Sequence, residues 1–458
     1  MQRRMFLNAG LATTVHRRMR QPQSASSPNI ILFVADDLGY GDLGCYGSAI
    51  PTPNLDGLAA EGVRFNHYYS AGAVCSPARA GILTGRYATR VGVPGVLFPS
   101  DTKGLSLAET TLPQVLKTKN YSSMSIGKWH LGSQVDYLPT RRGFDRFFGV
   151  PYSNDMCPPL MRDCDIIDPA PRNDLLTTLF TEQAVNYIHA TAGSPFFLYL
   201  AYTAPHIPLG ISSRFRGKSG LGPYGDCVQE IDWSVGQVLR ALTDAGIDQD
   251  TVVLFTSDHG PWYLGSPGPL RGRKGETYDG GLRVPLLARW PGIFPARRTI
   301  QAAAAALDIL PTVARLTGAS LPSTLLDGVD IATLLSGQSE SVDRPPFFYF
   351  QGWDLQCARV GPWKLHIARQ NGSMWAPDPP DGRLNLPLPA PELYNIVSDP
   401  GEDYDLAPDR PDIVADIRSK IEAALPTFPV EVHNAWNDTM NRHVEATPSG
   451  APPVLRKP

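Results

Sequence analysis

The sequence NIILFV occupies positions Asn29 to Val34 and is the apolar run that decides the fold. Branched apolar side chains without polar interruption are typical of a strand buried on both faces of a parallel sheet. Similar runs predict three more strands at Tyr121 to Ile126, Phe196 to Tyr202 and Thr251 to Thr256. The stretches between them have helical apolar spacing, which predicts helices at Leu55 to Glu61, Leu107 to Lys119 and Asp226 to Ala245. This alternation predicts an α/β fold with a large, mainly parallel sheet sandwiched by helices.

A cluster of polar and proline residues at 337 to 346 separates this region from a second, smaller one. We expect antiparallel strands there at Phe347 to Phe350, Cys357 to Val360 and Trp363 to Ile367, followed by an amphipathic helix at Pro411 to Leu425. The predicted organisation is therefore a leader at 1–28, a catalytic α/β domain at 29–340, a C-terminal antiparallel sheet with a helix at 341–445, and a tail at 446–458.

The composition excludes several classes of protein. The chain has 458 residues, a net charge of −3 and 42% hydrophobic residues, which excludes a disordered polyelectrolyte and gives no electrostatic basis for nucleic-acid binding. No uninterrupted run of about 18 apolar residues occurs, so no transmembrane segment is expected. The 42 glycines and 44 prolines predict many ordered loops on a large scaffold.

The first 28 residues resemble an export leader. Arg3-Arg4 precedes a weakly apolar run, and Ser24-Ala25-Ser26 forms a zone of small residues, as in twin-arginine signals. We therefore expect a periplasmic or extracellular protein. A cytosolic tail is the alternative interpretation, because His16-Arg17-Arg18 interrupts the leader before the cleavage zone.

Polar, reactive residues follow each of the four predicted strands. Because ligands bind at the carboxyl ends of strands in open α/β sheets, we expect these residues to form one site. They are Asp36 and Asp37, Lys128 and His130, His206, and Asp258 and His259.

The acidic residues among them suggest a metal site. Asp36 and Asp37 would repel each other unless a cation neutralised them, and Asp258 adds a third carboxylate. Three hard oxygen ligands suit Ca²⁺ or Mg²⁺. The nitrogen of His259 is compatible with Mn²⁺ or Zn²⁺ as well.

Cys75 is the most informative of the six cysteines. Ser76 and Pro77 predict an N-cap and a first helical residue, which would place Cys75 at the N-terminus of a helix, where the helix dipole favours anions. Arg79 could add a fixed positive charge beside it. A thiol nucleophile and a simply buried cysteine are both compatible with this pattern.

The segment Cys75-Ser76-Pro77-Ala78-Arg79, continued as AGILTGR to Arg86, resembles the signature of the type I sulfatases, formylglycine-dependent members of the alkaline phosphatase superfamily. Arg142 to Asp155 resembles the arylsulfatase A-like enzymes in particular. Other matching segments read ADDLGYGD from Ala35, TPNLD from Thr52, GKWHLG from Gly127, APH from Ala204, SDHG from Ser257, KGETYDGG from Lys274 and ELYN from Glu392, followed by Asp399-Pro400 and Glu402. The resemblance, which runs from about Asn29 to about Leu425, implies the alkaline-phosphatase-like fold and the hydrolysis of sulfate esters.

The resemblance also implies a metal and a modified nucleophile. Asp36, Asp37, Asp258 and His259 would bind one divalent cation, usually Ca²⁺ in this family, together with the modified Cys75. A maturation enzyme would oxidise Cys75 to formylglycine, whose hydrated aldehyde, a gem-diol, attacks the sulfur of the ester. The second hydroxyl of the diol can then expel sulfate, whereas a plain serine would stay sulfated.

Basic side chains take catalytic roles by the same resemblance. Arg79 would help to ionise the attacking hydroxyl, and Lys128 and Lys274 would hold the sulfate oxygens, where charge builds up during transfer. His130 would be the base that releases sulfate, and His206 would protonate the leaving group.

The resemblance implies a sulfated small molecule or glycan as substrate, with Ser153 at a substrate-contacting position. Where arylsulfatase A-like enzymes more often carry Asn, this chain has His259. The resemblance extends here to other sulfatases and to phosphonate monoester hydrolases of the same superfamily, which also carry His. A phosphonate monoester or phosphodiester hydrolase is therefore the alternative function, and the identity of the metal stays open. A non-catalytic protein that only binds sulfated glycans would lack a motif residue, and none is lacking.

Conversion of Cys75 would leave five cysteines, an odd number, which predicts at least one free thiol or an intermolecular pair. Cys157 and Cys164 are close enough in the sequence to form a disulfide staple in an exported protein.

Overall fold

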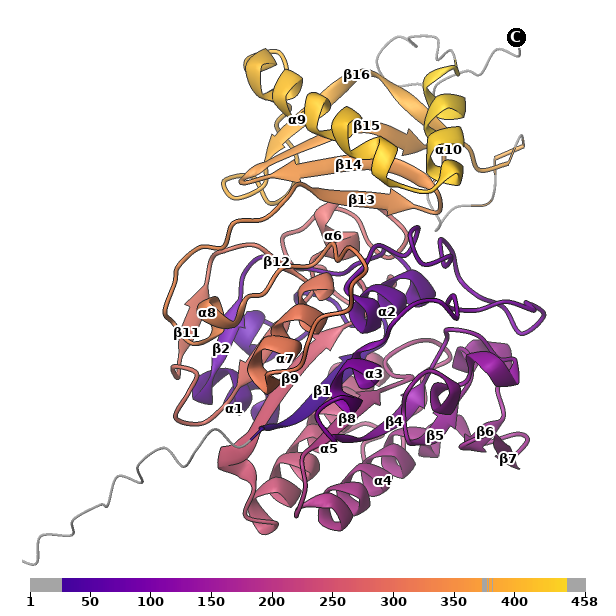
Figure 1. Cartoon of the computed structure of the whole chain (residues 1–458), viewed down its shortest axis with the longest axis vertical. Coiled ribbons are helices and arrows are strands. Elements are labelled where there is room, and N and C mark those ends of the chain that lie inside the picture. Colours follow the sequence, from indigo (N-terminus) through magenta and orange to yellow (C-terminus); the bar gives the residue numbers. More distant parts are fainter. Residues whose placement is uncertain (1–26, 373–376, 378, 381, 443–458) are drawn as a thin grey trace, which may run out of the picture.

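The computed structural model describes residues 27–372, 377, 379, 380 and 382–442 (Figure 1). The predicted leader at 1–28, apart from its last two residues, and the predicted tail at 446–458 lie outside this part of the chain.

Four parallel strands form the centre of the main sheet, as the sequence predicts. They are β1 (Asn29–Ala35), β8 (Phe196–Ala201), β9 (Thr251–Ser257) and β4 (Ser122–Lys128). They lie in the order β9-β1-β8-β4, and each is parallel to its neighbours. Since parallel strands share the direction of their carboxyl ends, the polar residues that follow them meet at one edge.

The sheet continues on both sides and becomes mixed. Beyond β4 lies the parallel strand β5, and antiparallel pairs follow at β5-β6, β6-β7, β9-β10 and β10-β2. The outer strands are β5 (Arg146–Val150), β6 (Leu160–Arg162), β7 (Asp165–Asp168), β10 (Leu286–Arg289), β2 (Val63–Phe65) and β11 (Arg298–Ile300).

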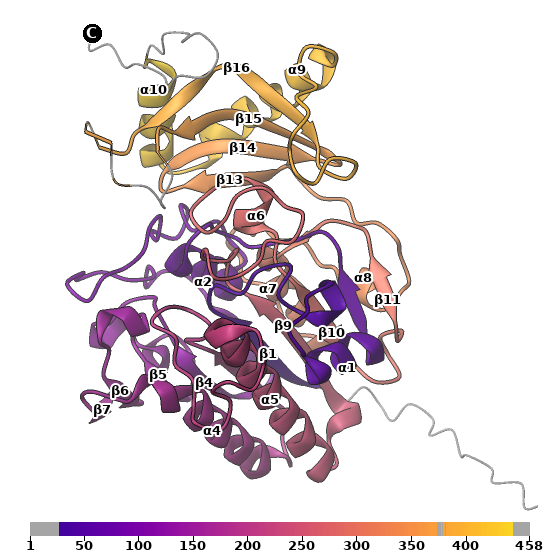
Figure 2. The same cartoon turned by 180° about the vertical axis from the view of Figure 1, so that it is seen from behind.

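Helices cover both faces of this sheet (Figures 1 and 2). Successive side chains of β1 point to opposite faces, so Ile30 and Leu32 enter one apolar core while Ile31 and Phe33 enter the other. The first core includes residues of α2 (Cys75–Thr84), α3 (Leu112–Lys117) and α7 (Ile309–Thr317), and the second includes residues of α1 (Pro53–Glu61), α4 (Leu176–Thr191) and α5 (Gly222–Asp244). No helix of the described residues combines the length and the apolar character needed to cross a bilayer.

The predicted helix at Leu107 to Lys119 is wrong in its extent, because α3 has only six residues. Its start is set by a capping box, in which the backbone N–H of Thr111 donates to Gln114 Oε1 at 2.8 Å. The preceding residues form a turn, in which the N–H of Glu109 donates to the carbonyl of Ser106 at 3.0 Å. Short elements outside the prediction are β3 (Tyr68–Tyr69), β12 (Ala304–Ala305), α6 (Asp279–Leu282) and α8 (Ala332–Leu335).

A second, antiparallel sheet lies at the other end of the molecule (Figure 1). It consists of β13 (Phe347–Gln351), β14 (Asp354–Val360), β15 (Trp363–Gln370) and β16 (Asn385–Asn395), in that order. Helices α9 (Pro411–Ala424) and α10 (Val430–Met440) cover it. The sequence did not predict β16 or α10. Pro387, Pro389 and Pro391 argue against a strand, but β16 lies at the sheet edge, where a missing N–H costs no ladder hydrogen bond.

The disulfide that the sequence would allow between Cys157 and Cys164 is not formed in the structure, where all six cysteines are free thiols. Cys157 is exposed, whereas the Sγ atom of Cys164 lies 3.4 Å from Thr140 Oγ1.

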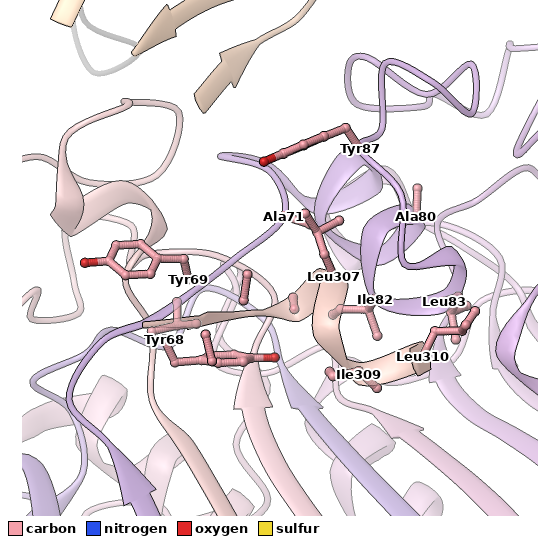
Figure 3. Close-up of a cluster of buried hydrophobic side chains, with 14 of the residues drawn as sticks. Tyr68, Tyr69, Ala71, Ala80, Ile82, Leu83, Tyr87, Leu307, Ile309 and Leu310 are labelled. Atoms are coloured by element: carbon pink, nitrogen blue, oxygen red, sulfur yellow. The ribbon is translucent and has the colours of Figure 1, made fainter. Parts of the chain in front are cut away.

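Helix α2 is fixed by apolar packing along its length (Figure 3). Its Ile82 and Leu83 lie in the first core with Leu307, in the turn that leads into α7, and Leu310, in α7 itself. All four side chains are fully buried. A close-packed helix holds its first turn in one position. This matters because α2 begins at Cys75.

A buried ion cluster joins the two sheets. The Lys364 ammonium on β15 lies 2.9 Å from Asp279 Oδ1 and 3.1 Å from Glu402 Oε1, and all three side chains are fully buried. His366 Nε2 lies 2.6 Å from Glu402 Oε2. Such a cluster is stable only while every charge keeps its partner.

We expect Lys364→Met to lower the free energy of unfolding by about 3–5 kcal/mol, because it removes the ammonium group that two buried carboxylates, Asp279 and Glu402, share. Lys420→Met is the matched control, since Lys420 forms an exposed ion pair with Asp416 on α9, and the expected loss there is below about 1 kcal/mol. Thermal unfolding of both variants measures the difference. Equal midpoints would show that the buried cluster does not stabilise the fold.

Candidate active site

The polar residues predicted at the strand ends converge in the structure. Asp36 and Asp37 follow β1, Lys128 ends β4, and Asp258 and His259 follow β9. All five are buried, with at most 1% of their surface exposed. The structure thus brings the side chains at these strand ends together at the carboxyl edge of the sheet.

Four side chains could hold a metal ion together. They are Asp36, Asp37, Cys75 and His259, each of which offers one donor atom, and these atoms lie within 4.8 Å of one another. The Cys75 Sγ atom is 3.3 Å from His259 Nε2 and 3.7 Å from Asp36 Oδ1. His259 Nε2 is 3.5 Å from Asp37 Oδ1. A search of the described residues finds no second group of this kind.

The donor set fits a divalent cation. Asp37 Oδ2 is buried without a hydrogen-bond partner among the described residues, which is costly unless a ligand satisfies it. Two other oxygens of this acidic pair lie against ammonium groups, since Lys128 Nζ is 2.6 Å from Asp36 Oδ2 and Lys274 Nζ is 2.6 Å from Asp37 Oδ1. Two buried carboxylates, one of which has an oxygen without a hydrogen-bond partner among the described residues, suit a hard cation.

Asp258 adjoins this group without belonging to it. Its Oδ1 atom lies 3.6 Å from His259 Nε2, and its Oδ2 atom accepts a hydrogen bond of 2.9 Å from Arg79 Nη2. Arg79 also donates to the carbonyl of Lys128 at 2.9 Å. Of the five ligands predicted from the sequence, the structure brings four together and places the fifth beside them.

Cys75 lies at the N-terminus of α2, as predicted, but the predicted cap is wrong. Val74, which has an extended backbone, precedes the helix, and Ser76 lies within its first turn. The hydroxyl of Ser76 instead accepts a hydrogen bond of 3.1 Å from the N–H of Leu97. Ser76 thus anchors the loop at Leu97, whose carbonyl also contacts His130.

The surroundings of Cys75 favour negative charge. Burial alone would raise the pKa of the Cys75 thiol, but Lys128, Lys274 and His259 outweigh it and hold that pKa well below its ordinary value. The helix dipole acts in the same direction. An anionic group formed from this side chain is therefore stabilised where it stands.

His130 is arranged to accept a proton. Burial, with the charge of Lys128, lowers the pKa of His130, so the neutral ring predominates near neutral pH. Its Nε2 atom lies 2.8 Å from the carbonyl of Leu97, which can only accept, so we assign the proton to Nε2. Nδ1 is buried and has no hydrogen-bond partner among the described residues. That nitrogen is free to act as a base.

The remaining predicted residues also reach the site. Ser153 Oγ accepts a hydrogen bond of 3.0 Å from Lys128 Nζ, and His206 Nε2 lies 3.7 Å from Asp37 Oδ2. Two residues in contact with the site were not predicted from the sequence. The backbone carbonyl of Leu97 contacts His130, and the ring centre of Trp262 lies 5.8 Å from Lys274 Nζ. A backbone carbonyl leaves no residue-specific signal in a sequence.

Comparisons with known proteins agree with this geometry. The sulfatase family model matches residues 28–319, and the model of the C-terminal region of aryl-sulfatase matches residues 342–452. The chain is 40% identical to arylsulfatase A of Homo sapiens over 429 residues, which cover 83% of this chain and 84% of that protein. It is 36% identical to N-acetylgalactosamine-6-sulfatase of Rattus norvegicus, over 83% of this chain and 81% of that protein. The solved structure of PsFucS1 sulfatase from Pseudoalteromonas sp. superimposes with a TM-score of 0.79 at 26% identity, over 88% of this chain and 91% of that one.

The family model covers most of the chain, and the relatives match both its sheets. These relatives are named for the hydrolysis of sulfate esters, and the site described above contains the buried acids and cations that such a reaction requires. The chain belongs to the sulfatase family and is a sulfuric ester hydrolase with the alkaline-phosphatase-like fold.

Proposed function

We propose that this sulfatase acts through a formylglycine made from Cys75, with one divalent cation, Ca²⁺, held by Asp36, Asp37, Asp258, His259 and the modified residue. The observation that carries the proposal is the position of Cys75. Its side chain, at the start of α2, lies within 4.8 Å of donor atoms of Asp36, Asp37 and His259. When bound, the cation supplies a Lewis acid, and the hydrated aldehyde supplies the nucleophilic oxygen.

Lys128 and Lys274 bind the sulfate oxygens in this proposal. Both ammonium groups are buried, each within 2.6 Å of a carboxylate of the cluster. Buried cations stabilise the charge that develops on the sulfate more strongly than exposed ones do. Ser153 orients Lys128 through their 3.0 Å hydrogen bond and contacts the substrate. Arg79 contributes a fixed positive charge, because its guanidinium lies 2.9 Å from Asp258 and 3.6 Å from Asp36.

Two histidines move protons. His130 takes a proton on Nδ1, the nitrogen that lacks a partner, when the second hydroxyl of the nucleophile releases sulfate. His206 Nδ1 donates to the carbonyl of Ile207, so the ring delivers a proton from Nε2 to the oxygen of the departing alcohol or phenol only in its doubly protonated form, and the neutral ring results.

The names of the relatives support an aryl sulfate or a sulfated sugar as substrate class. The comparisons do not favour the alternative of a phosphonate or phosphodiester hydrolase. We expect the matured enzyme to hydrolyse 4-nitrophenyl sulfate with a kcat/KM at least about 10²-fold above that for 4-nitrophenyl phenylphosphonate. A ratio of this size corresponds to a difference of about 3 kcal/mol in transition-state binding between the two esters. Spectrophotometric assay of both esters at equal enzyme concentration measures the ratio. A ratio below one would assign the enzyme to the phosphonate hydrolases.

The organisation of the whole chain is part of the proposal. We infer a catalytic domain at 29–340 and a C-terminal domain at 341–445, preceded by a twin-arginine-like leader that directs export to the periplasm or beyond. The maturation enzyme that converts Cys75 is the one protein partner that the proposal requires.

A further inference from the structure

A cavity lies beside the C-terminal sheet, apart from the active site. Its volume is about 430 Å³, and none of the residues assigned above to the sulfatase site lines it. The lining comes from residues 301–303, from the chain between α8 and β13, and from the turn between β14 and β15. Figures 1 and 2 show that chain passing along the side of the molecule to the C-terminal sheet.

One wall of the cavity is formed by a buried guanidinium, that of Arg359. Only 5% of this residue is exposed. Its Nε donates a 2.8 Å hydrogen bond to the carbonyl of Gly361, whereas Nη1 is buried and has no hydrogen-bond partner among the described residues. No ion pair joins Arg359 to a carboxylate in the described part of the chain. The ring of Tyr69 is another neighbour, with its centre 4.8 Å from Cζ.

Burying an unpaired guanidinium is costly, so the neighbouring charges matter. The two buried carboxylates nearby are already occupied: Asp279 lies 2.9 Å from Lys364 and accepts a 2.8 Å hydrogen bond from Tyr69, and Glu402 lies 3.1 Å from Lys364. Arg283 adds another buried cation, 3.8 Å from Asp279. The buried charges around Arg359 are therefore three cations, namely Lys364, Arg283 and Arg359 itself, and two carboxylates, those of Asp279 and Glu402.

The electrostatics of His67 agree with this arrangement of charges. Burial and the charges of Arg283 and Arg359 together lower the pKa of His67 to about 3, against the opposing effect of Asp279. His67 Nδ1 is itself buried without a partner among the described residues. Arg283 and Arg359 therefore act as positive charges on their buried neighbours.

The other walls are mainly apolar. Val342, Pro345, Phe347 and Pro362 line the cavity with Arg359. A second arginine, Arg344, also lines it, but its guanidinium is paired with Asp308 at 3.0 Å. Gln301, Glu340 and Ser341 add polar groups to the lining, and the Glu340 carboxylate is paired with Arg298 at 2.8 Å. A cavity of this size with mainly apolar walls and a few polar groups has the composition of a small-molecule site.

We propose that this cavity binds a small organic anion, whose oxyanion group pairs with Arg359 and whose apolar body contacts Phe347 and Val342. The site is distinct from the sulfatase centre, and its occupancy does not depend on the formylglycine or the metal. An oxyanion beside Arg359 would balance a buried guanidinium that no carboxylate of the described residues pairs, and an apolar body would fill the rest of the volume. Inorganic sulfate alone leaves most of the cavity unfilled, so it should bind much more weakly.

The test uses 8-anilinonaphthalene-1-sulfonate as the anionic probe and N-phenyl-1-naphthylamine as its uncharged counterpart. Fluorescence titration of the full chain should show saturable binding of the sulfonate. Arg359→Gln should weaken it at least about tenfold, because a charge-assisted hydrogen bond is lost, and should leave binding of the amine unchanged. Arg410→Gln is the matched control, since Arg410 also lies over an aromatic ring of this domain, 5.2 Å from the centre of Trp363, but is exposed.

Two further variants separate the possible outcomes. Ala302→Leu adds volume at the cavity wall and should weaken binding of both probes, which keeps the proposal testable should Arg359→Gln fail to fold. Cys75→Ala should leave sulfonate binding unchanged, because the active site is not involved. Unchanged sulfonate affinity in Arg359→Gln or in Ala302→Leu, or loss of binding in Cys75→Ala, would overturn the proposal without touching the sulfatase assignment.

Discussion

Cys75→Ala should abolish the hydrolysis of 4-nitrophenyl sulfate, with kcat reduced at least about 10⁴-fold, the scale seen when a covalent nucleophile is removed. The loss should be catalytic and not structural, because the Cys75 side chain is small and α2 is held by the apolar contacts of Ile82 and Leu83. Steady-state kinetics and a thermal unfolding curve distinguish the two. Cys227→Ala is the matched control, since Cys227 is also buried but lies on α5 and packs into the second core.

Cys75→Ser sharpens this prediction. A serine can attack the ester once, but it lacks the second hydroxyl that expels sulfate, so the variant should accumulate a stable sulfate ester at position 75. Mass spectrometry of the peptide that spans Cys75 shows this adduct in the variant and formylglycine in the native protein. An unmodified cysteine in active protein purified from its own host would reject the formylglycine mechanism, and full activity of Cys75→Ala would reject the nucleophile.

Removal of the metal has the second largest expected effect. Dialysis against a chelator should lower kcat/KM roughly 10³-fold, because Lewis-acid stabilisation of the transition state contributes several kcal/mol. Ca²⁺ should restore activity, and metal analysis of the reactivated enzyme should show one ion per chain. Recovery with Zn²⁺ or Mn²⁺ alone would instead assign the site to a softer cation, which His259 Nε2 would favour.

A pair of carboxylate variants locates the cation. Asp37→Asn removes charge from the residue whose Oδ2 atom is buried without a partner, and it should raise the Ca²⁺ concentration needed for half-maximal activity at least about tenfold. Asp145→Asn, at a partly exposed carboxylate paired with Lys117, should leave that concentration unchanged. Equal Ca²⁺ requirements in the two variants would exclude Asp37 as a ligand.

Local sequence was sufficient to predict the central strands. The run at Asn29 to Val34 is apolar because both faces of β1 are buried, and its counterparts in β8 and β9 are mostly apolar for the same reason. The counterpart in β4 is buried as well, although it contains Ser122, Ser123 and Ser125. Their polar ends predict a single site because parallel strands bring like ends to one edge. The helices were predicted less well. Thr111 and Gln114 start α3 later than its apolar spacing suggests, since a cap outweighs periodicity in so short a helix.

The sequence by itself determined which residue types stand at the strand ends and, through its resemblance to the sulfatases, which chemistry they serve. Only the tertiary structure decided which of them meet. Cys75 and His259 are 184 residues apart and come within 3.3 Å because α2 and β9 pack in one core. In the same way, β16 is a strand despite its three prolines because it lies at a sheet edge. Arg359 is left without an anion because the cations and carboxylates around it come from different parts of the chain. Contacts of this kind depend on which faces are buried against each other, and no local pattern encodes that.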